Sequence, residues 1–276
     1  MTASSDFFVR FWGVRGSIPC PGPATVRYGG NTSCLEVRCG ERLFVLDAGS
    51  GLRMLDRALG PGPLDADVLF THTHLDHVNG WAFFTRLTDP RNRIEVWAGH
   101  LDGTHRITDV LGRFLEDPLA PVHAGNLAAT VTYHEFRQGD SLTPRHGVKV
   151  RTAGLNHPNN ATGYRIEYGG HAICYVTDTE HKDDVRDPAI LGLIEKSDIF
   201  IYDATYTDQE YPKYAGWGHS SWQEGMRLAD AAGVGTYVAF HHDPGHDDDA
   251  MDAIAALLGR ARPGSVVARE GMVLRP

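Results

Sequence analysis

Three histidines and one aspartate crowd into the six residues His72-Thr-His74-Leu-Asp76-His77. Imidazole nitrogens and carboxylate oxygens are the ligands that Zn²⁺, Mn²⁺ and Fe²⁺ bind in proteins. His72 and His74 can address one ion, while Asp76 and His77 face another. The segment follows an apolar run over 68–70, so it stands where a strand ends and a turn begins. We therefore expect two adjacent metal sites, with Zn²⁺ as the first choice of ion and Mn²⁺ or Fe²⁺ as alternatives.

Three further residues of types that can bind a metal follow downstream, each after a short apolar run. They are His157 in Leu-Asn-His-Pro, Asp178 in Tyr-Val-Thr-Asp-Thr, and His241 in Val-Ala-Phe-His-His. A lone histidine or aspartate at a strand end is more often structural. Taken with the first motif and in this order, the three residues form a pattern that is much more specific.

The full pattern resembles the metallo-β-lactamase superfamily, whose H-x-H-x-D-H motif is followed by a single His, a bridging Asp and a last His. The resemblance implies two divalent metal ions and a division of the ligands between them. His242 is the alternative for the last position, but the relatives place this ligand directly after an apolar strand, which favours His241. The implied ligands are His72, His74 and His157 for one ion, Asp76, His77 and His241 for the other, and Asp178 as the bridge.

Two later motifs are similar to the phosphodiesterase branch that includes ribonuclease Z and the cyclic-phosphate hydrolase of phosphonate breakdown. Asp203-Ala-Thr-Tyr206 resembles a Glu-Ala-Thr-aromatic segment, and Gly218-His219-Ser220-Ser221 resembles a His-Ser-Thr motif. Asp203 is one methylene shorter than the glutamate of that pattern. An imidazolium held by a carboxylate can donate a proton to a leaving oxygen. Asp203 and His219, together with Asp76, are therefore the catalytic candidates.

The resemblance implies a metal-dependent phosphoric diester hydrolase, in which hydroxide generated between the two ions attacks phosphorus. A small phosphodiester, such as a cyclic nucleotide or another cyclic phosphate, is the favoured substrate. RNA or an oligonucleotide end is the alternative. It is less favoured because the long flexible arm of ribonuclease Z is not found and because 26 basic against 35 acidic residues give a net charge of −9.

Other reactions and roles compete with this interpretation. A lactam, thioester or lactone hydrolase would use the same metal ligands, and only Asp203 and His219 argue against it. The related diiron oxidoreductases carry Glu at the position of His74 and a fused flavin domain, neither of which is present. A non-catalytic binding module is disfavoured because every ligand position is filled.

The elements that must position these residues follow from hydrophobic periodicity and turn residues. We expect helices over 50–59, 188–196, 221–232 and 247–261, the third opened by a capping box at Ser221. Over 99–130 the pattern loosens into a helix and an irregular loop, a candidate lid. Two strand-rich halves covered by helices are compatible with a four-layer αββα sandwich and with an ordinary three-layer α/β fold. The resemblance to the superfamily implies the α/β fold of the four-layer αββα type. The expected strands cover 7–13, 34–39, 43–47, 68–72, 148–153, 163–168, 172–178, 198–204, 236–241, 266–269 and 272–274.

Length and composition favour one globular domain over 1–276. The four cysteines lack C-x-x-C spacing and the first residues lack the apolar stretch of a secretory signal, which indicates a cytoplasmic protein with reduced thiols. No run approaches the roughly 18 apolar residues of a membrane span. Whether two chains pair as a homodimer is left open.

Overall fold

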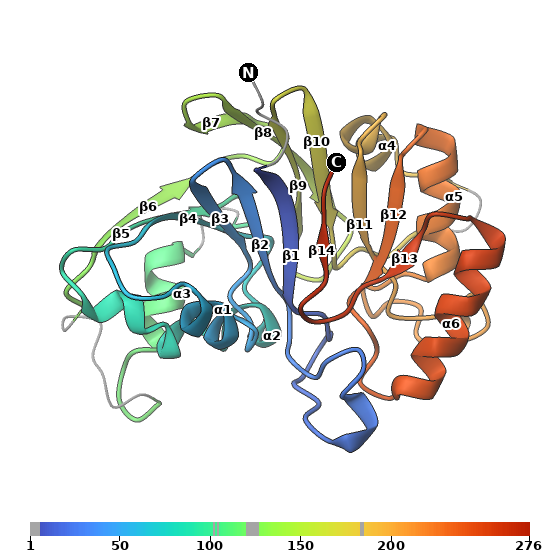
Figure 1. Ribbon diagram of the computed structural model, residues 1–276, viewed down its shortest axis with the longest axis horizontal. Helices are drawn as coiled ribbons and strands as arrows, with labels where there is room; N and C mark the ends of the chain where they lie inside the picture. The colour runs from blue at the N-terminus through green and yellow to red at the C-terminus, as the bar shows by residue number, and fades with distance from the viewer. Residues whose placement is uncertain (1–5, 102, 104, 120–126, 183–184) are drawn as a thin grey trace.

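Two seven-stranded sheets face each other in the computed structural model, which describes residues 6–101, 103, 105–119, 127–182 and 185–276. Helices α1, α2 and α3 cover the outer face of the first sheet, and α4, α5 and α6 cover that of the second (Figure 1). In sheet order, the first sheet consists of β14 (Val273–Leu274), β1 (Phe7–Gly13), β2 (Cys34–Cys39), β3 (Arg42–Leu46), β4 (Asp65–Phe70), β5 (Arg93–Ala98) and β6 (Thr130–Glu135).

The second sheet repeats this layout from the other half of the chain. Its order is β13 (Val266–Val267), β12 (Thr236–Phe240), β11 (Ile199–Asp203), β10 (His171–Val176), β9 (Ala161–Tyr168), β8 (Val148–Leu155) and β7 (Ser141–Arg145). The helices are α1 (Leu52–Ala58), α2 (Leu75–Val78), α3 (Ile107–Arg113), α4 (Pro188–Ile194), α5 (Trp222–Ala232) and α6 (Asp248–Ala261).

Three apolar clusters hold the layers together. The central cluster fills the space between the sheets with residues such as Phe11, Tyr175 and Phe240. The outer clusters join each sheet to its helices, one around Leu52 and the other around Leu228. Side chains alternate between the two faces of each strand, so every strand can serve an inner and an outer cluster. The predicted four-layer αββα sandwich is confirmed.

The carboxyl ends of several strands meet at one edge of the sandwich. β3 pairs in parallel with β4, and β10, β11 and β12 pair in parallel with one another. β8 runs in the same direction as β10, because both pair antiparallel with β9. Residues that directly follow these strands are therefore brought together, which is where α/β folds place their ligands.

The strands that lead into the site end earlier than the sequence predicts. The predicted ranges 43–47, 172–178 and 236–241 stop at Leu46, Val176 and Phe240. Asp47, Asp178 and His241 lie beyond these ends with φ of 60°, 59° and 62°. This left-handed conformation is incompatible with a strand and is uncommon outside glycine. At each position the chain turns sharply and aims the side chain across the sheet edge.

Other differences concern the edges of the sheets. β5, β6 and β7 were not predicted, and the exposed alternate residues of β6 and β7 gave little apolar signal. In the range of the candidate lid, α3 corresponds to the predicted helix, whereas residues 102, 104 and 120–126 lie outside the described residues. Among helices of the described ranges, none combines the length and hydropathy that a membrane span requires.

Candidate metal centre

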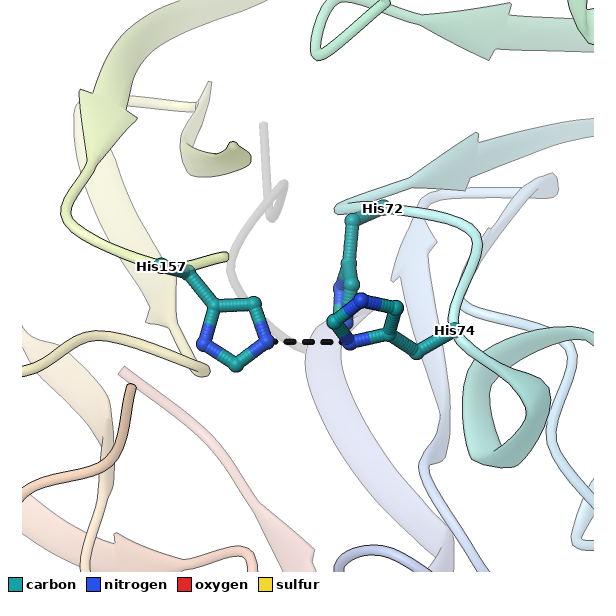
Figure 2. Close-up of side chains that lie close together, drawn as sticks. All are labelled: His72, His74 and His157. Atoms are coloured by element: carbon teal, nitrogen blue, oxygen red, sulfur yellow. Dashed lines mark hydrogen bonds between the residues drawn. The ribbon is translucent and has the colours of Figure 1, made fainter. Parts of the chain in front are cut away.

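Two of the first-motif histidines meet His157, which follows β8, at the edge of the two sheets. The rings of His72 and His74 lie 4.4 Å apart, and that of His157 lies 4.8 Å and 4.9 Å from them. Nε2 of His157 is 3.0 Å from Nδ1 of His74. Figure 2 shows the three side chains converging from the two sides of the site. Residues 83 positions apart thus present nitrogen atoms to one point.

A second group lies directly beside the first. Asp76, His77, Asp178 and His241 are all buried and offer ligand atoms within 4.8 Å of one another. Oδ2 of Asp76 lies 3.3 Å from Nε2 of His77 and 3.4 Å from Nε2 of His241. The two imidazole rings are stacked at 5.5 Å. The structure therefore brings together all seven predicted ligands, in the two groups that the sequence predicts.

Asp178 stands between the two groups and faces each with a different oxygen. Oδ1 lies 3.7 Å from Nε2 of His72 and 3.6 Å from Nε2 of His157. Oδ2 lies 3.2 Å from Nε2 of His77 and 3.3 Å from Nε2 of His241. This placement would suit a carboxylate shared by two ions, one held by each group.

The hydrogen bonds of four of the five histidine rings leave Nε2 as the candidate ligand atom, whereas His74 turns Nδ1 towards His157 and Nε2 towards Asn159. A ring whose Nδ1–H donates to an oxygen presents the lone pair of Nε2. Nδ1 has such a partner in four rings, and among the residues that the structure describes no protein atom hydrogen-bonds the buried Nε2 of His72, His77 or His241. Buried unpartnered nitrogens are costly, so the donor set fits metal ions. The Nδ1 partners are Thr71 Oγ1 for His72 (3.1 Å), Asp47 Oδ2 for His77 (2.8 Å), Gly218 O for His157 (2.7 Å) and Thr205 Oγ1 for His241 (3.1 Å).

Asp47 is a supporting residue that the sequence analysis missed. Its buried carboxylate accepts hydrogen bonds from the backbone and hydroxyl of Thr71 and from Tyr175 at 2.9 Å, in addition to that from His77. An acidic residue directly after the apolar strand β3 was the available signal, but the prediction placed it inside that strand. Its carboxylate orients one candidate ligand and holds the turn that presents another, His72.

The predicted catalytic pair is formed. Oδ2 of Asp203 lies 3.0 Å from Nδ1 of His219, and Oδ1 accepts a hydrogen bond from the hydroxyl of Thr205 at 2.7 Å. The His219 ring stacks on that of His241 with centroids 5.0 Å apart. Burial opposes protonation of His219, but Asp203, together with Asp178 and Asp76, outweighs it and raises the pKa of His219 to about 9. Without bound ions, His219 is therefore suited to carry a proton at neutral pH.

The turn over 13–19, which contains Gly13 and Gly16 and to which the sequence analysis assigned no role, also reaches the site. The backbone N–H of Ser17 donates to Oδ2 of Asp76 at 2.8 Å. A Cβ at Gly16 would lie 2.4 Å from Cε1 of His241. Glycine is needed there because the backbone passes against the ring.

His242 points away from the ligand groups. Its Nε2 is 2.8 Å from the carbonyl oxygen of Ala268, on the neighbouring segment of the chain. Burial lowers the pKa of His242 to about 3, so the ring is neutral. Of the two adjacent histidines, His241 is the one whose side chain lies in the cluster.

A cavity of about 420 Å³ opens on the first histidine group. Nδ2 of Asn159 lies 3.3 Å from Nε2 of His74, and His100 hydrogen-bonds Thr73 at 3.1 Å. The polar residues that line this cavity are His72, His74, His100, His105, Asn159 and Asn160. The sequence analysis named none of the last four, which carry no metal-ligand spacing.

Comparison with known proteins agrees with this fold. Residues 42–242 match the family described as the beta-lactamase superfamily domain. A ribonuclease Z of Myxococcus xanthus is 25% identical over 279 aligned residues, covering 84% of this chain and 86% of that protein. A solved diphosphatase from the PhnP family has a TM-score of 0.73 at 17% identity and covers 98% of both chains. Human tRNase Z, short form, has a TM-score of 0.69 at 19% identity, covering 97% and 98%.

The fold and the donor set define a hydrolase of the metallo-β-lactamase type. The chain belongs to the beta-lactamase superfamily, whose domain spans most of its length. The similarity to ribonuclease Z confirms the predicted resemblance to the phosphodiesterase branch. The prediction of an enzyme, a metal-dependent hydrolase, is confirmed with it.

Proposed function

We propose that the chain is a dinuclear metal-dependent phosphodiesterase that acts on a small phosphodiester, such as a cyclic nucleotide or another cyclic phosphate. The observation that carries this proposal is the position of His219. Held by Asp203 at 3.0 Å, it lies with His157 and Asp178 in one group of ligand atoms. A proton donor at the edge of a two-metal site is what departure of an alkoxide requires.

Seven residues of the chain would hold the two metal ions of this reaction. His72, His74 and His157 would hold one ion, Asp76, His77 and His241 the other, and Asp178 would bridge them. Zn²⁺ is the proposed ion, because imidazole and carboxylate donors suit it. Bound ions would acidify a water for attack on phosphorus and neutralise charge on the phosphoryl oxygens.

The other catalytic candidates would transfer a proton to the leaving oxygen and orient the attacking water. Nδ1 of His219 is committed to Asp203, so Nε2 is the atom from which a proton would pass to the leaving oxygen. Asp76, whose Oδ2 is fixed by the backbone N–H of Ser17, would orient the attacking water. The nucleophile is then water, and no serine or cysteine of the chain needs to form a covalent intermediate.

The size of the adjoining cavity supports a small substrate. A volume of about 420 Å³ lies within the range of pockets that enclose a ligand of nucleotide size. Asn159, Asn160 and His105 can donate hydrogen bonds to phosphate or sugar oxygens. The overall charge of −9 also disfavours a polyanionic polymer.

RNA is the second candidate, and the similarity to ribonuclease Z over most of both chains favours it. Such a substrate would use the same metal ligands and His219, but would need contacts beyond the cavity. A competition assay, in which a structured RNA is added to the hydrolysis of a small cyclic phosphodiester, distinguishes the two candidate substrates. If small cyclic phosphodiesters are hydrolysed and a structured RNA does not inhibit, the small-substrate proposal stands. Cleavage of the RNA without turnover of the small esters would replace it.

The experiment that tests the reaction class measures hydrolysis of bis(p-nitrophenyl) phosphate beside nitrocefin and a thioester. We expect phosphodiester turnover by the zinc-loaded protein, abolished by Asp178→Ala. On diphenyl phosphate, assayed in parallel because its leaving group is more basic, His219→Ala should reduce turnover roughly 10² to 10⁴-fold. Cleavage of the lactam or thioester without phosphodiester turnover would overturn the proposal and favour the alternative hydrolases.

We further propose that residues 1–276 act as one domain in the cytoplasm. The central core joins strands from both halves of the chain, which supports a single unit. The four cysteines are free thiols, which suits a reducing compartment. Whether two chains pair as a homodimer stays open, and light scattering on the zinc-loaded protein measures it.

A further inference from the structure

The side chain of Glu180 is bound to the backbone of the loop that carries His219. Its Oε1 and Oε2 lie 2.8 Å and 2.9 Å from the backbone N of Gly216, and Oε2 also accepts the backbone N–H of Gly218 at 2.7 Å. Gly216 and Gly218 have φ of 90° and 86°. A carboxylate therefore clamps a tight turn whose shape other residues would adopt only with strain.

This loop contacts the candidate ligand His157 and also carries the proposed proton donor His219. The carbonyl oxygen of Gly218 accepts the Nδ1–H of His157 at 2.7 Å, and the next residue is His219. A Cβ at Gly218 would lie 2.4 Å from Nδ1 of His157, so the fit is close. A shift of the loop would displace the proposed proton donor relative to the ligands.

The backbone of Glu180 is fixed at the other end of the clamp. Its N–H donates to the carbonyl of Asn156 at 2.8 Å, and Nδ2 of Asn156 donates to the carbonyl of Glu180 at 2.8 Å. Asn156 directly precedes His157, and Glu180 stands two residues after Asp178. The clamp thus ties the His219 loop to the two segments that present candidate ligands from β8 and β10.

A carboxylate suits this task better than its neutral analogues. Two oxygens can accept from two amides at once, whereas Gln offers one acceptor and would turn an NH₂ group towards an N–H. Asp is one methylene shorter. Hydrogen bonds from neutral amides to a charged acceptor are stronger than neutral ones, so the clamp can hold the two positive-φ glycines.

We infer that Glu180 is a positioning residue for proton transfer: by holding Gly216 and Gly218 it aims His219 at the leaving oxygen. The inference rests on the proposed phosphodiesterase function. Glu180 touches neither the substrate nor an ion in this account. Its contribution should therefore depend on how much the leaving group needs a proton.

The test compares aryl phosphodiesters from bis(p-nitrophenyl) phosphate to diphenyl phosphate, whose leaving group is more basic and gains more from protonation. The variants are Glu180→Ala, Glu180→Gln and His219→Ala, with bound zinc measured for each. We expect Glu180→Ala to retain zinc, to lose less than about 10-fold on the nitrophenyl ester and to lose about 10²-fold on the phenyl ester, as His219→Ala does. Glu180→Gln should fall between Glu180→Ala and the wild type, which keeps the test available if the alanine variant folds poorly.

Glu210→Ala is the matched control. Glu210 lies in the same connection between β11 and α5, and its side chain bonds the backbone N–H of Thr207 at 2.8 Å and the ring of His246 at 2.9 Å rather than Gly216 or Gly218. This variant should leave the leaving-group dependence unchanged. If the Glu180 variants lose activity equally along the series, or keep the wild-type dependence while His219→Ala does not, the inference is wrong and the proposed function stands. If the wild type hydrolyses no phosphodiester, the proposed function itself fails.

Discussion

The carboxylate of Asp203 reaches the ring of His219 with Oδ2 and Nδ1 3.0 Å apart, although the side chain is one methylene shorter than the glutamate of the pattern it resembles. Asp203 is fully buried, and the backbone N–H of Thr179 donates to the same oxygen at 3.2 Å. The pair is therefore preorganised by β11 and by the segment that carries Asp178. The shorter reach does not break the dyad.

The pH dependence of stability should report this pair in the metal-free protein. The folded pKa of His219 is raised to about 9, above the value of about 6.5 for a free histidine. The stabilisation is fully present below about pH 6.5 and is lost as pH rises through 9. We expect the free energy of unfolding of the wild type to exceed that of His219→Gln most at about pH 6 and least near pH 10. A gap that widens with pH would contradict the assigned protonation.

Gly218→Ala should damage the first histidine group. The new Cβ would be strained by the φ of 86° and would meet Nδ1 of His157 at 2.4 Å. We expect zinc affinity to fall about 10 to 100-fold, as when a ligand loses its supporting contact, measured by competition with a chelator. Gly271→Ala is the control, because its φ is 81° but its Cβ would meet nothing within 4 Å. Equal loss in both variants would show that backbone strain alone is responsible.

Asp47→Asn should weaken the second group without removing a ligand. The amide cannot reproduce all the hydrogen bonds that the carboxylate accepts from His77, Thr71 and Tyr175. Zinc affinity should fall about 10 to 100-fold, whereas Tyr175→Phe, which removes one of these bonds, should cost less. Titration of the metal-free variants with zinc gives both values. Unchanged affinity in Asp47→Asn would mean that His77 keeps its orientation without Asp47.

His241→Ala and His242→Asn should separate the two adjacent histidines. His241→Ala removes a candidate ligand and should lower bound zinc by about one equivalent per chain. His242→Asn removes the contact with Ala268 and should cost roughly 1–3 kcal/mol of stability while the zinc content stays unchanged. Elemental analysis and chemical denaturation measure the two effects. Zinc loss in His242→Asn with retention in His241→Ala would reverse the assignment.

The candidate ligands of the first motif could be predicted from the sequence because metal coordination demands particular side chains, and the later candidates followed from the resemblance to the superfamily. The motif His72 to His77 is local, so its spacing alone indicates two sites. Periodicity likewise predicted most strands and helices, since an element that buries one face has apolar residues at a regular spacing in the sequence. The exposed edge strands β6 and β7 left no such trace.

Only the tertiary structure decided which way the side chains point and which distant residues support them. His241 and His242 are neighbours in sequence, but the φ of 62° at His241 sends one ring into the site and leaves the other beside Ala268. Asp47 and Glu180 act on partners 30 and 36 to 38 positions away. Such contacts depend on how the two sheets bring their strand ends together, and no local pattern of residues records that arrangement.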